Sequence, residues 1–259
     1  MGYLLAIIIG LTLGLIGGGG SVLTVPVLVY VMGISPVSAT AYSLFIVGLA
    51  SLFGARKYYK VGDIAIHIGV VFSIPAFLGV FISRKFLLPN IPEVLGELGT
   101  FVLTKDIMLM LFFAFIMLLA AFSMIFVKQA ANQEGEKNFS YWKVGAEGII
   151  VGIITGIVGA GGGFLIIPAL VLLTGLPMKK AVGTSLMIIA VKSLFGFLGE
   201  WGNEMDWVLL GTFSMLAIGG IYLGAYLSRF IEGNKLKKSF GIFILLMAVF
   251  IILKETALV

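Results

Sequence analysis

Residues 14–54 read GLIGGGGSVLTVPVLVYVMGISPVSATAYSLFIVGLASLFG, and residues 156–196 repeat this stretch as GIVGAGGGFLIIPALVLLTGLPMKKAVGTSLMIIAVKSLFG. At a constant offset of 142 positions, 17 of the 41 aligned pairs are identical and no gap is needed. The identities include glycines, serines and the prolines Pro26 and Pro168, which an apolar bias alone would not align. The chain is therefore an internal duplication.

Outside this block the match is looser. Asp63 lies near the place of Asp206, and Leu78-Gly79 followed by Ser83-Arg84 resembles Leu223-Gly224 followed by Ser228-Arg229. Residues 128–143 (KQAANQEGEKNFSYWK) are polar and are typical of a linker. We therefore predict a first membrane repeat over 1–127, a linker loop over 128–143 and a second membrane repeat over 144–259.

The composition indicates a membrane protein. Hydrophobic residues make up 60% of the chain and charged residues 11%, with a mean hydropathy of +1.17, whereas a soluble domain needs more polar surface. The apolar runs of roughly 18 to 22 residues match the length that a bilayer imposes on a helix. We expect an all-α polytopic protein of a prokaryotic plasma membrane. No Lys or Arg precedes the first apolar run, so no removable signal peptide is expected.

Ten helical segments are expected, and the first two of each copy are short. At 1.5 Å per residue the first two segments span roughly 20 and 18 Å, less than the bilayer core. Each pair of short segments therefore forms either one broken membrane crossing or a hairpin that returns to the side of the membrane from which it started. Such a hairpin is either re-entrant or a pair of full crossings. The expected segments are 3–16, 22–33, 37–54, 64–82 and 107–127, then 145–158, 164–175, 181–199, 207–228 and 239–253.

The basic residues distinguish these topologies. If each pair is a broken crossing, seven basic residues lie on one side of the membrane and nine on the other. If each pair is a hairpin, twelve lie on one side and four on the other, which fits the excess of Lys and Arg in cytoplasmic loops. Loops 55–62 and 128–143 are then cytoplasmic, and loop 200–206 and both termini lie outside. We predict two inverted repeats, each with a glycine-broken helical hairpin plus three transmembrane helices. This orientation also explains the pI near 9.3, so nucleic acid is not an expected partner.

The glycine runs are the first candidate substrate-binding residues. A glycine costs about 1 kcal/mol in a helix, so the runs mark breaks, and broken backbone inside a membrane must line protein or a polar cavity. The helix that follows each break presents free N–H groups to an anion. Close helix packing is the alternative. Valine at Gly20 or Gly162 is expected to impair binding more than folding. The candidates are Gly17, Gly19, Gly20, Ser21, Gly159, Gly161, Gly162 and Gly163.

Polar side chains near the breaks are further candidates. Ser43, Thr184 and Ser185 can donate hydroxyl hydrogens to an oxyanion, or they can simply join helices. Lys192 lies inside an apolar helix, where lysine costs about 2.5–3.5 kcal/mol, and its repeat partner is Ala50. Lys192 is thus expected to bind the substrate; snorkelling to the surface or a pair with Glu147 are the alternatives.

Other polar residues suggest weaker roles. His67, the only histidine, can carry a coupling proton or be a tolerated interfacial residue. Arg84 and Arg229 are expected to be interfacial anchors. The chain has no cysteine, and it lacks H-E-x-x-H, G-x-S-x-G and G-x-x-x-x-G-K motifs. We therefore expect no catalytic residues, no metal and no cofactor.

The paired G-x-G-G motifs, Gly17 to Gly20 and Gly159 to Gly162, are each followed by a proline, at Pro26 and Pro168. In this the chain resembles the sulfite exporter TauE/SafE family over nearly its whole length. The resemblance implies a secondary transporter that moves sulfite, a sulfonate or a related sulfur-containing anion across the plasma membrane. A small-anion channel and an intramembrane enzyme are the alternatives. The expected partners are a small anionic substrate and the lipid bilayer, and a homodimer is left open.

Overall fold

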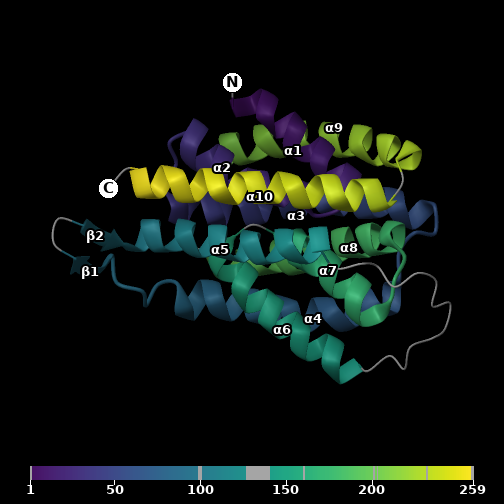
Figure 1. The fold of residues 1–259 in the computed structure, drawn as a ribbon, viewed down its shortest axis with the longest axis horizontal. Helices are drawn as coiled ribbons and strands as arrows, with labels where there is room; N and C mark the ends of the chain where they lie inside the picture. Colours follow the sequence, from purple (N-terminus) through teal and green to yellow (C-terminus); the bar gives the residue numbers. More distant parts are fainter. Residues whose placement is uncertain are drawn as a thin grey trace.

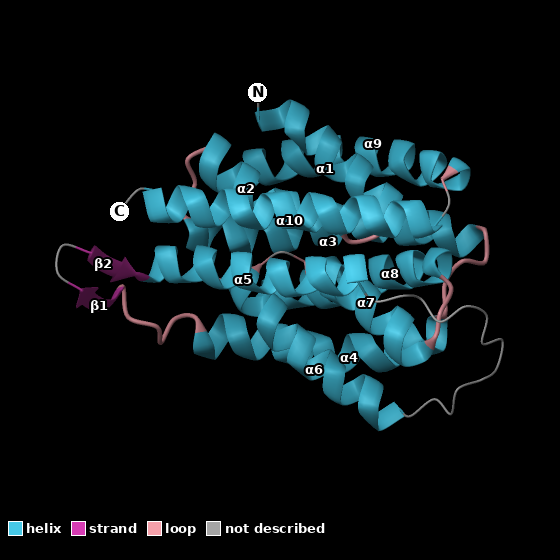
Figure 2. Cartoon of the chain, in the orientation of Figure 1, coloured by secondary structure: helices cyan, strands magenta, loops and turns pink. Residues whose placement is uncertain are grey.

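A computed structural model describes residues 2–98, 101–126, 141–159, 161–200, 202, 204–231 and 233–257. Within these ranges the chain forms ten α-helices and one two-stranded hairpin (Figures 1 and 2). The first copy contains α1 (Gly2–Ile16), α2 (Gly19–Pro26), α3 (Pro36–Lys60), α4 (Ile66–Ile82) and α5 (Lys105–Phe126). The second contains α6 (Tyr141–Val158), α7 (Gly163–Thr174), α8 (Met178–Phe197), α9 (Trp207–Leu227) and α10 (Gly233–Ala257). Each expected helical segment is present.

Local chemistry explains several helix ends. Pro36 occupies the first turn of α3, where its missing N–H costs nothing, and the Ser35 hydroxyl accepts from the Ser38 N–H at 3.4 Å. Asp206 caps α9 through the Leu209 N–H at 2.9 Å. α7 ends at Gly175, whose φ of +69° favours glycine.

Some helices run further than predicted. A five-residue π-helical turn extends α4 to Leu87, five residues past the predicted end at 82, whereas the one that follows α2 ends at Val31, two residues short of the predicted 33. α3 continues six residues past the predicted end at 54, to Lys60. There Lys57 Nζ donates to the Tyr222 carbonyl at 2.7 Å, which ties the end of α3 to α9. α10 starts at Gly233 rather than at 239.

The connection between α4 and α5 is a β-hairpin, so the all-α expectation is wrong here. β1 (Val94–Leu98) and β2 (Phe101–Thr104) pair antiparallel, with Glu97 opposite Val102. The hairpin projects from one end of the helix bundle in Figure 1. Its β-branched and aromatic residues suit a pleated ladder, and the segment lies outside the block that the internal repeat aligns.

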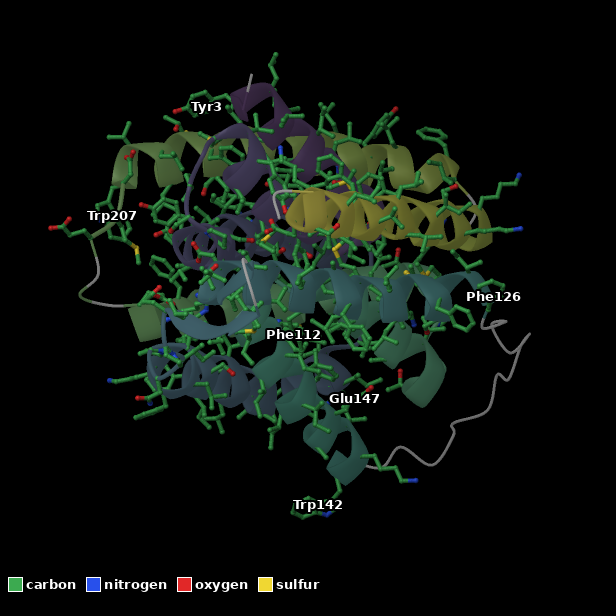
Figure 3. The ribbon with its side chains drawn as sticks, turned by 60° about the vertical axis from the view of Figure 1, so that its left-hand side comes forward. Tyr3, Phe112, Phe126, Trp142, Glu147 and Trp207 are labelled. Atoms are coloured by element: carbon green, nitrogen blue, oxygen red, sulfur yellow. The ribbon has the colours of Figure 1, made fainter. Side chains whose placement is uncertain are left out.

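The outer surface of the bundle is that of a polytopic membrane protein. Among the described residues, five helices are long and apolar enough to cross a bilayer: Pro36–Lys60, Ile66–Leu87, Lys105–Phe126, Met178–Glu200 and Trp207–Leu227. Large apolar side chains face outward, as Trp142 and Phe126 do in Figure 3, and Met215 is 77% exposed. Contiguous apolar surface of this kind mostly meets lipid rather than water.

The first helix of each copy packs in the other copy. α1 lies along α9, and α6 lies along α4. Both contacts use glycines at the 142-residue offset, because Gly10 lies against Ala217 and Gly152 against Ala76. Small residues let membrane helices approach closely at such crossings. In addition α3 packs on α8, and α5 packs on α10.

These contacts correct the looser part of the repeat. A Cβ atom at Gly79 would meet Ile149, Gly152 and Ile153, and one at Gly220 would meet Ile7, Gly10 and Leu11, the same positions 142 residues earlier. Gly79 therefore corresponds to Gly220, and the predicted match with Gly224 is wrong by one helical turn. Because α9 has glycines at both 220 and 224, the sequence alone did not show which of them corresponds to Gly79.

The predicted linker lies mostly outside the described residues, which omit 127–140. The described part resumes at Tyr141, where α6 begins, so the last three residues of the predicted linker, 141–143, are helical. The repeat boundaries at 127 and 144 stay predictions.

Candidate functional site

The first glycine break joins α1 to α2 in a tight hairpin. Gly17, between the two helices, has a φ of +75°, which a residue with a Cβ rarely adopts. A Cβ at Gly20 would collide with the Ile9 carbonyl and with Leu13, so α2 turns back along α1. At the far end a Cβ at Gly2 would lie 3.0 Å from Met32. The first two segments thus return to the side from which they start, as the basic residues predict.

The second break is longer than the first, and more of its glycines have a positive φ. Gly159, Gly161 and Gly162 have φ values of +69°, +63° and +71°. Gly162 is the N-cap of α7, and Gly18 is the N-cap of α2; no side chain caps either helix. The N–H groups at both helix starts are therefore not taken by a capping side chain.

The two breaks meet in the interior. The backbone of Gly18 lies against that of Gly163, and a Cβ at Gly161 would lie 3.1 Å from the Ser21 Cβ. The meeting point lies between α3 and α8, because Gly161 contacts Val47 and Gly163 contacts Ile189. The structure thus brings the predicted Gly161 and Gly163 to the first break, where they meet the predicted Ser21 and also Gly18, which was not among the predicted site residues.

The outer ends of the two breaks are held in matching ways. Gly17 packs on Val182 and Ser185 of α8. Gly159 packs on Thr40 of α3, which is the residue 142 positions before Val182. Each break therefore touches the long central helix of the other copy.

Lys192 places a positive charge at the second break. Its side chain is fully buried, and Nζ donates to the Thr155 hydroxyl at 2.6 Å. A Cβ at Gly162 would lie 2.9 Å from this Nζ. In the described part of the chain no carboxylate pairs with Lys192, so neither a pair with Glu147 nor snorkelling describes this side chain. Thr155 was missed by sequence reasoning, although it is the only Ser or Thr in α6.

The predicted hydroxyl donors differ in availability. Ser43 is buried, and its Oγ has no hydrogen-bond partner within the described residues. Ser185 donates to the Val182 carbonyl at 2.8 Å, and Ser21 donates to the Gly18 carbonyl at 2.6 Å. The Thr184 hydroxyl accepts from the Ala65 N–H at 2.9 Å and so holds the loop before α4. Of these four hydroxyls, that of Ser43 is the one without a hydrogen-bond partner in the described residues, so a ligand bound to it would displace no existing bond.

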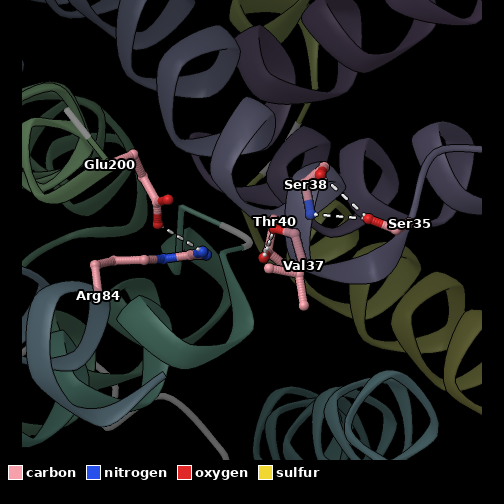
Figure 4. A network of polar contacts seen from close by, with 6 residues as sticks. All are labelled: Ser35, Val37, Ser38, Thr40, Arg84 and Glu200. Atoms are coloured by element: carbon pink, nitrogen blue, oxygen red, sulfur yellow. Dashed lines mark hydrogen bonds and ion pairs between the residues drawn. The ribbon is translucent and has the colours of Figure 1, made fainter. Parts of the chain in front are cut away.

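Arg84 is not the interfacial anchor that its helix-end position suggested. It is 2% exposed, and its Nη1 forms an ion pair with Glu200 Oε1 at 3.1 Å (Figure 4). Glu200 had not been singled out from the sequence. His67 is exposed in the first turn of α4. The side chain of Arg229 lies outside the described part of the structure.

The polar character of the site belongs to the second copy. Lys192, Thr155 and Gly162 correspond at the 142-residue offset to Ala50, Leu13 and Gly20. A Cβ at Gly162 would touch Thr155, and one at Gly20 would touch Leu13, so the two contacts are equivalent. At equivalent places of the fold, the second copy therefore has a lysine and a threonine, whereas the first copy has an alanine and a leucine.

Comparison with known proteins supports membrane transport. The chain is 28% identical over 257 residues to a "Probable membrane transporter protein" of Xylella fastidiosa, covering 96% of this chain and 93% of that protein. A protein of the same name from Haemophilus influenzae is 27% identical over 265 residues, with 95% and 94% covered. "Probable membrane transporter protein YdhB" of Bacillus subtilis is 28% identical over 239 residues, with 91% and 93% covered.

No solved structure matches the chain. Residues 3–251 match the sequence profile of the family described as sulfite exporter TauE/SafE. The match spans both copies of the repeat and includes both glycine breaks and Lys192. The chain therefore belongs to the sulfite exporter TauE/SafE family of membrane transporters.

Proposed function

We propose that this protein is a secondary transporter that moves sulfite, a sulfonate or a related small sulfur-containing anion across the plasma membrane. The observation that carries the proposal is the buried Lys192 ammonium beside Gly162, where two glycine breaks meet. A buried charge without a counter-ion is costly, and an anion at this place offsets that cost. The sulfur-containing class comes from the family description, and transport from the names of the relatives.

The anion would lie among the helix starts of α2 and α7, Lys192 and the Ser43 hydroxyl. Uncapped N–H groups at a helix start favour negative charge, and the ammonium adds a charge-assisted hydrogen bond. Ser43 supplies a buried hydroxyl that has no other partner in the described chain. The set contains donors and no carboxylate, which suits a small oxyanion better than a cation.

We further propose that the two copies are inverted in the membrane. α3 and α8, which are equivalent in the repeat, run antiparallel: a Cβ at Gly48 would contact Leu194, and one at Gly54 would contact Leu186. The division of basic residues places loop 55–62 in the cytoplasm. Single cysteines at Gly62 and Glu204, both exposed, test this topology. An impermeant thiol reagent added to intact cells should label Glu204→Cys and spare Gly62→Cys; the reverse pattern would reject the orientation.

Flux into proteoliposomes tests the function. Uptake of radiolabelled sulfite should saturate and should be inhibited by unlabelled sulfite or methanesulfonate more than by acetate. Empty liposomes and the Lys192→Met protein are the controls. Uptake that increases linearly without saturation would support a channel instead. Saturable uptake of acetate with no sulfite uptake would reject the proposed substrate class.

A further inference from the structure

A cavity opens at the end of the bundle where α3 finishes and α8 begins. It is lined by residues that include Leu15, Lys57, Tyr58, Lys179, Val182 and Ala225. Val182 also contacts Gly17, so the inner end of the cavity reaches the first glycine break. Lys57 and Lys179 on its wall attract an approaching anion, and the carboxylate of Asp63 on the same wall opposes part of that attraction. The cavity therefore lies between one end of the bundle and the first glycine break.

Arg84 and Glu200 lie toward the opposite face. α4 starts beside the cavity-lining Asp63 and α8 starts at the cavity-lining Met178, so the far ends of both helices lie at the other face. Arg84 follows α4, Glu200 follows α8, and the ion pair between them is buried. Figure 4 shows the guanidinium extended from its helix toward Thr40 in the first turns of α3.

The cavity and the ion pair occupy equivalent places in the two copies. Glu200 corresponds to Tyr58 at the 142-residue offset, and Thr40 corresponds to Val182. Gly79 and Gly220 are equivalent and lie 141 positions apart, and at the same offset Arg84 corresponds to Ala225. An alanine thus leaves open on one face the space that an arginine, paired with a glutamate, fills on the other.

We propose that the cavity is the vestibule through which the transported anion reaches the glycine breaks, and that the Arg84–Glu200 ion pair is the gate that closes the pathway at the opposite face. This inference rests on the proposed transport function. The described structure is then open to one side, and transport requires the ion pair to separate while the vestibule narrows.

The hydrogen bonding of Arg84 suits a contact that separates. Glu200 bonds to Nη1, whereas Nε and Nη2 are buried without a partner in the described residues. Buried donors without acceptors destabilise the closed arrangement, because opening would return them to water. A permanent structural ion pair would be expected to satisfy these donors. The closed gate therefore has a built-in tendency to open.

Thiol labelling tests the gate without any transported anion. Thr40→Cys and Val182→Cys are equivalent positions in the repeat, both nearly buried and each in contact with a glycine break. In membrane vesicles of both orientations, an impermeant methanethiosulfonate should react with Val182→Cys from the cavity face. It should react about tenfold more slowly with Thr40→Cys from the other face, because closed molecules predominate. Equal rates at the two positions would overturn the proposal.

Breaking the ion pair should reverse this preference. Glu200→Gln is expected to raise the labelling rate of Thr40→Cys about tenfold and to slow that of Val182→Cys. Lys85→Gln, at the exposed neighbour of Arg84, should change neither rate. Arg84→Met provides a second gate variant if Glu200→Gln fails to fold, because it removes the charge and the unpartnered donors together. Unchanged labelling in a folded gate variant would make the pair a static contact.

Flux separates this inference from the function on which it rests. Wild-type protein that takes up no anion would reject the proposed transport, whatever the labelling shows. Wild-type flux combined with unchanged Thr40→Cys labelling in the folded gate variants would reject the gate alone.

Discussion

The two glycine breaks share a motif and differ in chemistry. In the first break Gly17 alone has a positive φ, Leu13 packs beneath Gly20, and Ala50 stands at the central helix. In the second break three glycines have positive φ, and the equivalent places hold Thr155 and Lys192. The duplication thus kept the backbone break in both copies but placed the charge in one. We therefore expect substitutions in the first break to act mainly on packing and those in the second to act on anion binding as well.

The difference separates Gly20 from Gly162. A β-branched residue was expected to act alike at both, by blocking a positive φ. Gly162 does have a φ of +71°, whereas Gly20 lies within α2 and is needed because the α1 backbone passes close to it. This close approach replaces the expectation from the sequence that valine at Gly20 impairs binding more than folding: we now expect it to act on folding first.

The largest effect on stability is expected from placing the charge in the wrong copy. Ala50→Lys buries an ammonium where Leu13 replaces the threonine partner, which should cost about 2.5–3.5 kcal/mol. Adding Leu13→Thr should recover roughly 0.6 kcal/mol through the restored hydrogen bond. Thermal unfolding of the detergent-purified single and double variants measures both the loss of stability and its partial recovery. An Ala50→Lys protein as stable as wild type would show that the first break is polar after all.

Removing the charge from the second copy should act on binding. Lys192→Met keeps the helix apolar and loses a charged hydrogen bond of about 1.5–3 kcal/mol, which lowers anion affinity roughly 10- to 100-fold. Anion-induced stabilisation of the purified protein reports this loss. Lys85→Met, on an exposed lysine, is the matched control and should retain wild-type affinity. An unchanged affinity in folded Lys192→Met would place the anion elsewhere.

Valine at each break separates packing from binding. Gly20→Val should destabilise the fold by about 1–3 kcal/mol through overpacking against α1, with normal anion affinity in the folded fraction. Gly162→Val should strain the backbone by about 1–3 kcal/mol and also crowd Lys192 Nζ, so that affinity falls as well. Unfolding temperatures with and without sulfite distinguish the two. If sulfite stabilised both variants as it does wild type, Gly162 would be a packing glycine too.

The smallest effect is expected at the serines. Ser43→Ala removes a hydroxyl that has no partner in the described residues, so stability should hold while anion affinity falls by about 0.5–1.5 kcal/mol. Ser185→Ala is the equivalent control, because that hydroxyl already donates to Val182. Equal affinities for the two variants, measured by sulfite titration, would remove Ser43 from the site.

Sequence reasoning reached the backbone features because the repeat displays them. Glycine runs followed by prolines mark the breaks, and Gly17 and Gly159 do share a positive φ. The meeting of the breaks followed from inverting two copies whose helix starts must avoid lipid. The β-hairpin was missed, since its segment has no counterpart in the aligned block.

Side-chain pairs were harder to predict. The bond between Lys192 and Thr155 depends on how α6 is rotated about its axis, and the residues are 37 positions apart. Arg84 ends an apolar helix and so resembles an interfacial residue, but its partner Glu200 lies 116 positions away. No local pattern links such residues; only the packing of α4 against α8 brings them together.

The exchange of first helices between the copies has a consequence for biosynthesis. Gly10 of α1 packs on Ala217 of α9, so α1 enters the membrane long before its partner helix has been made. Until then the glycine seam of α1 faces lipid or a temporary neighbour, and distant contacts of this kind slow folding. A chain that stopped after the first copy would leave this seam uncovered and become a target for quality-control proteases. Conversely, the two halves made as separate polypeptides should stabilise one another, because each supplies the surface on which the other's first helix rests.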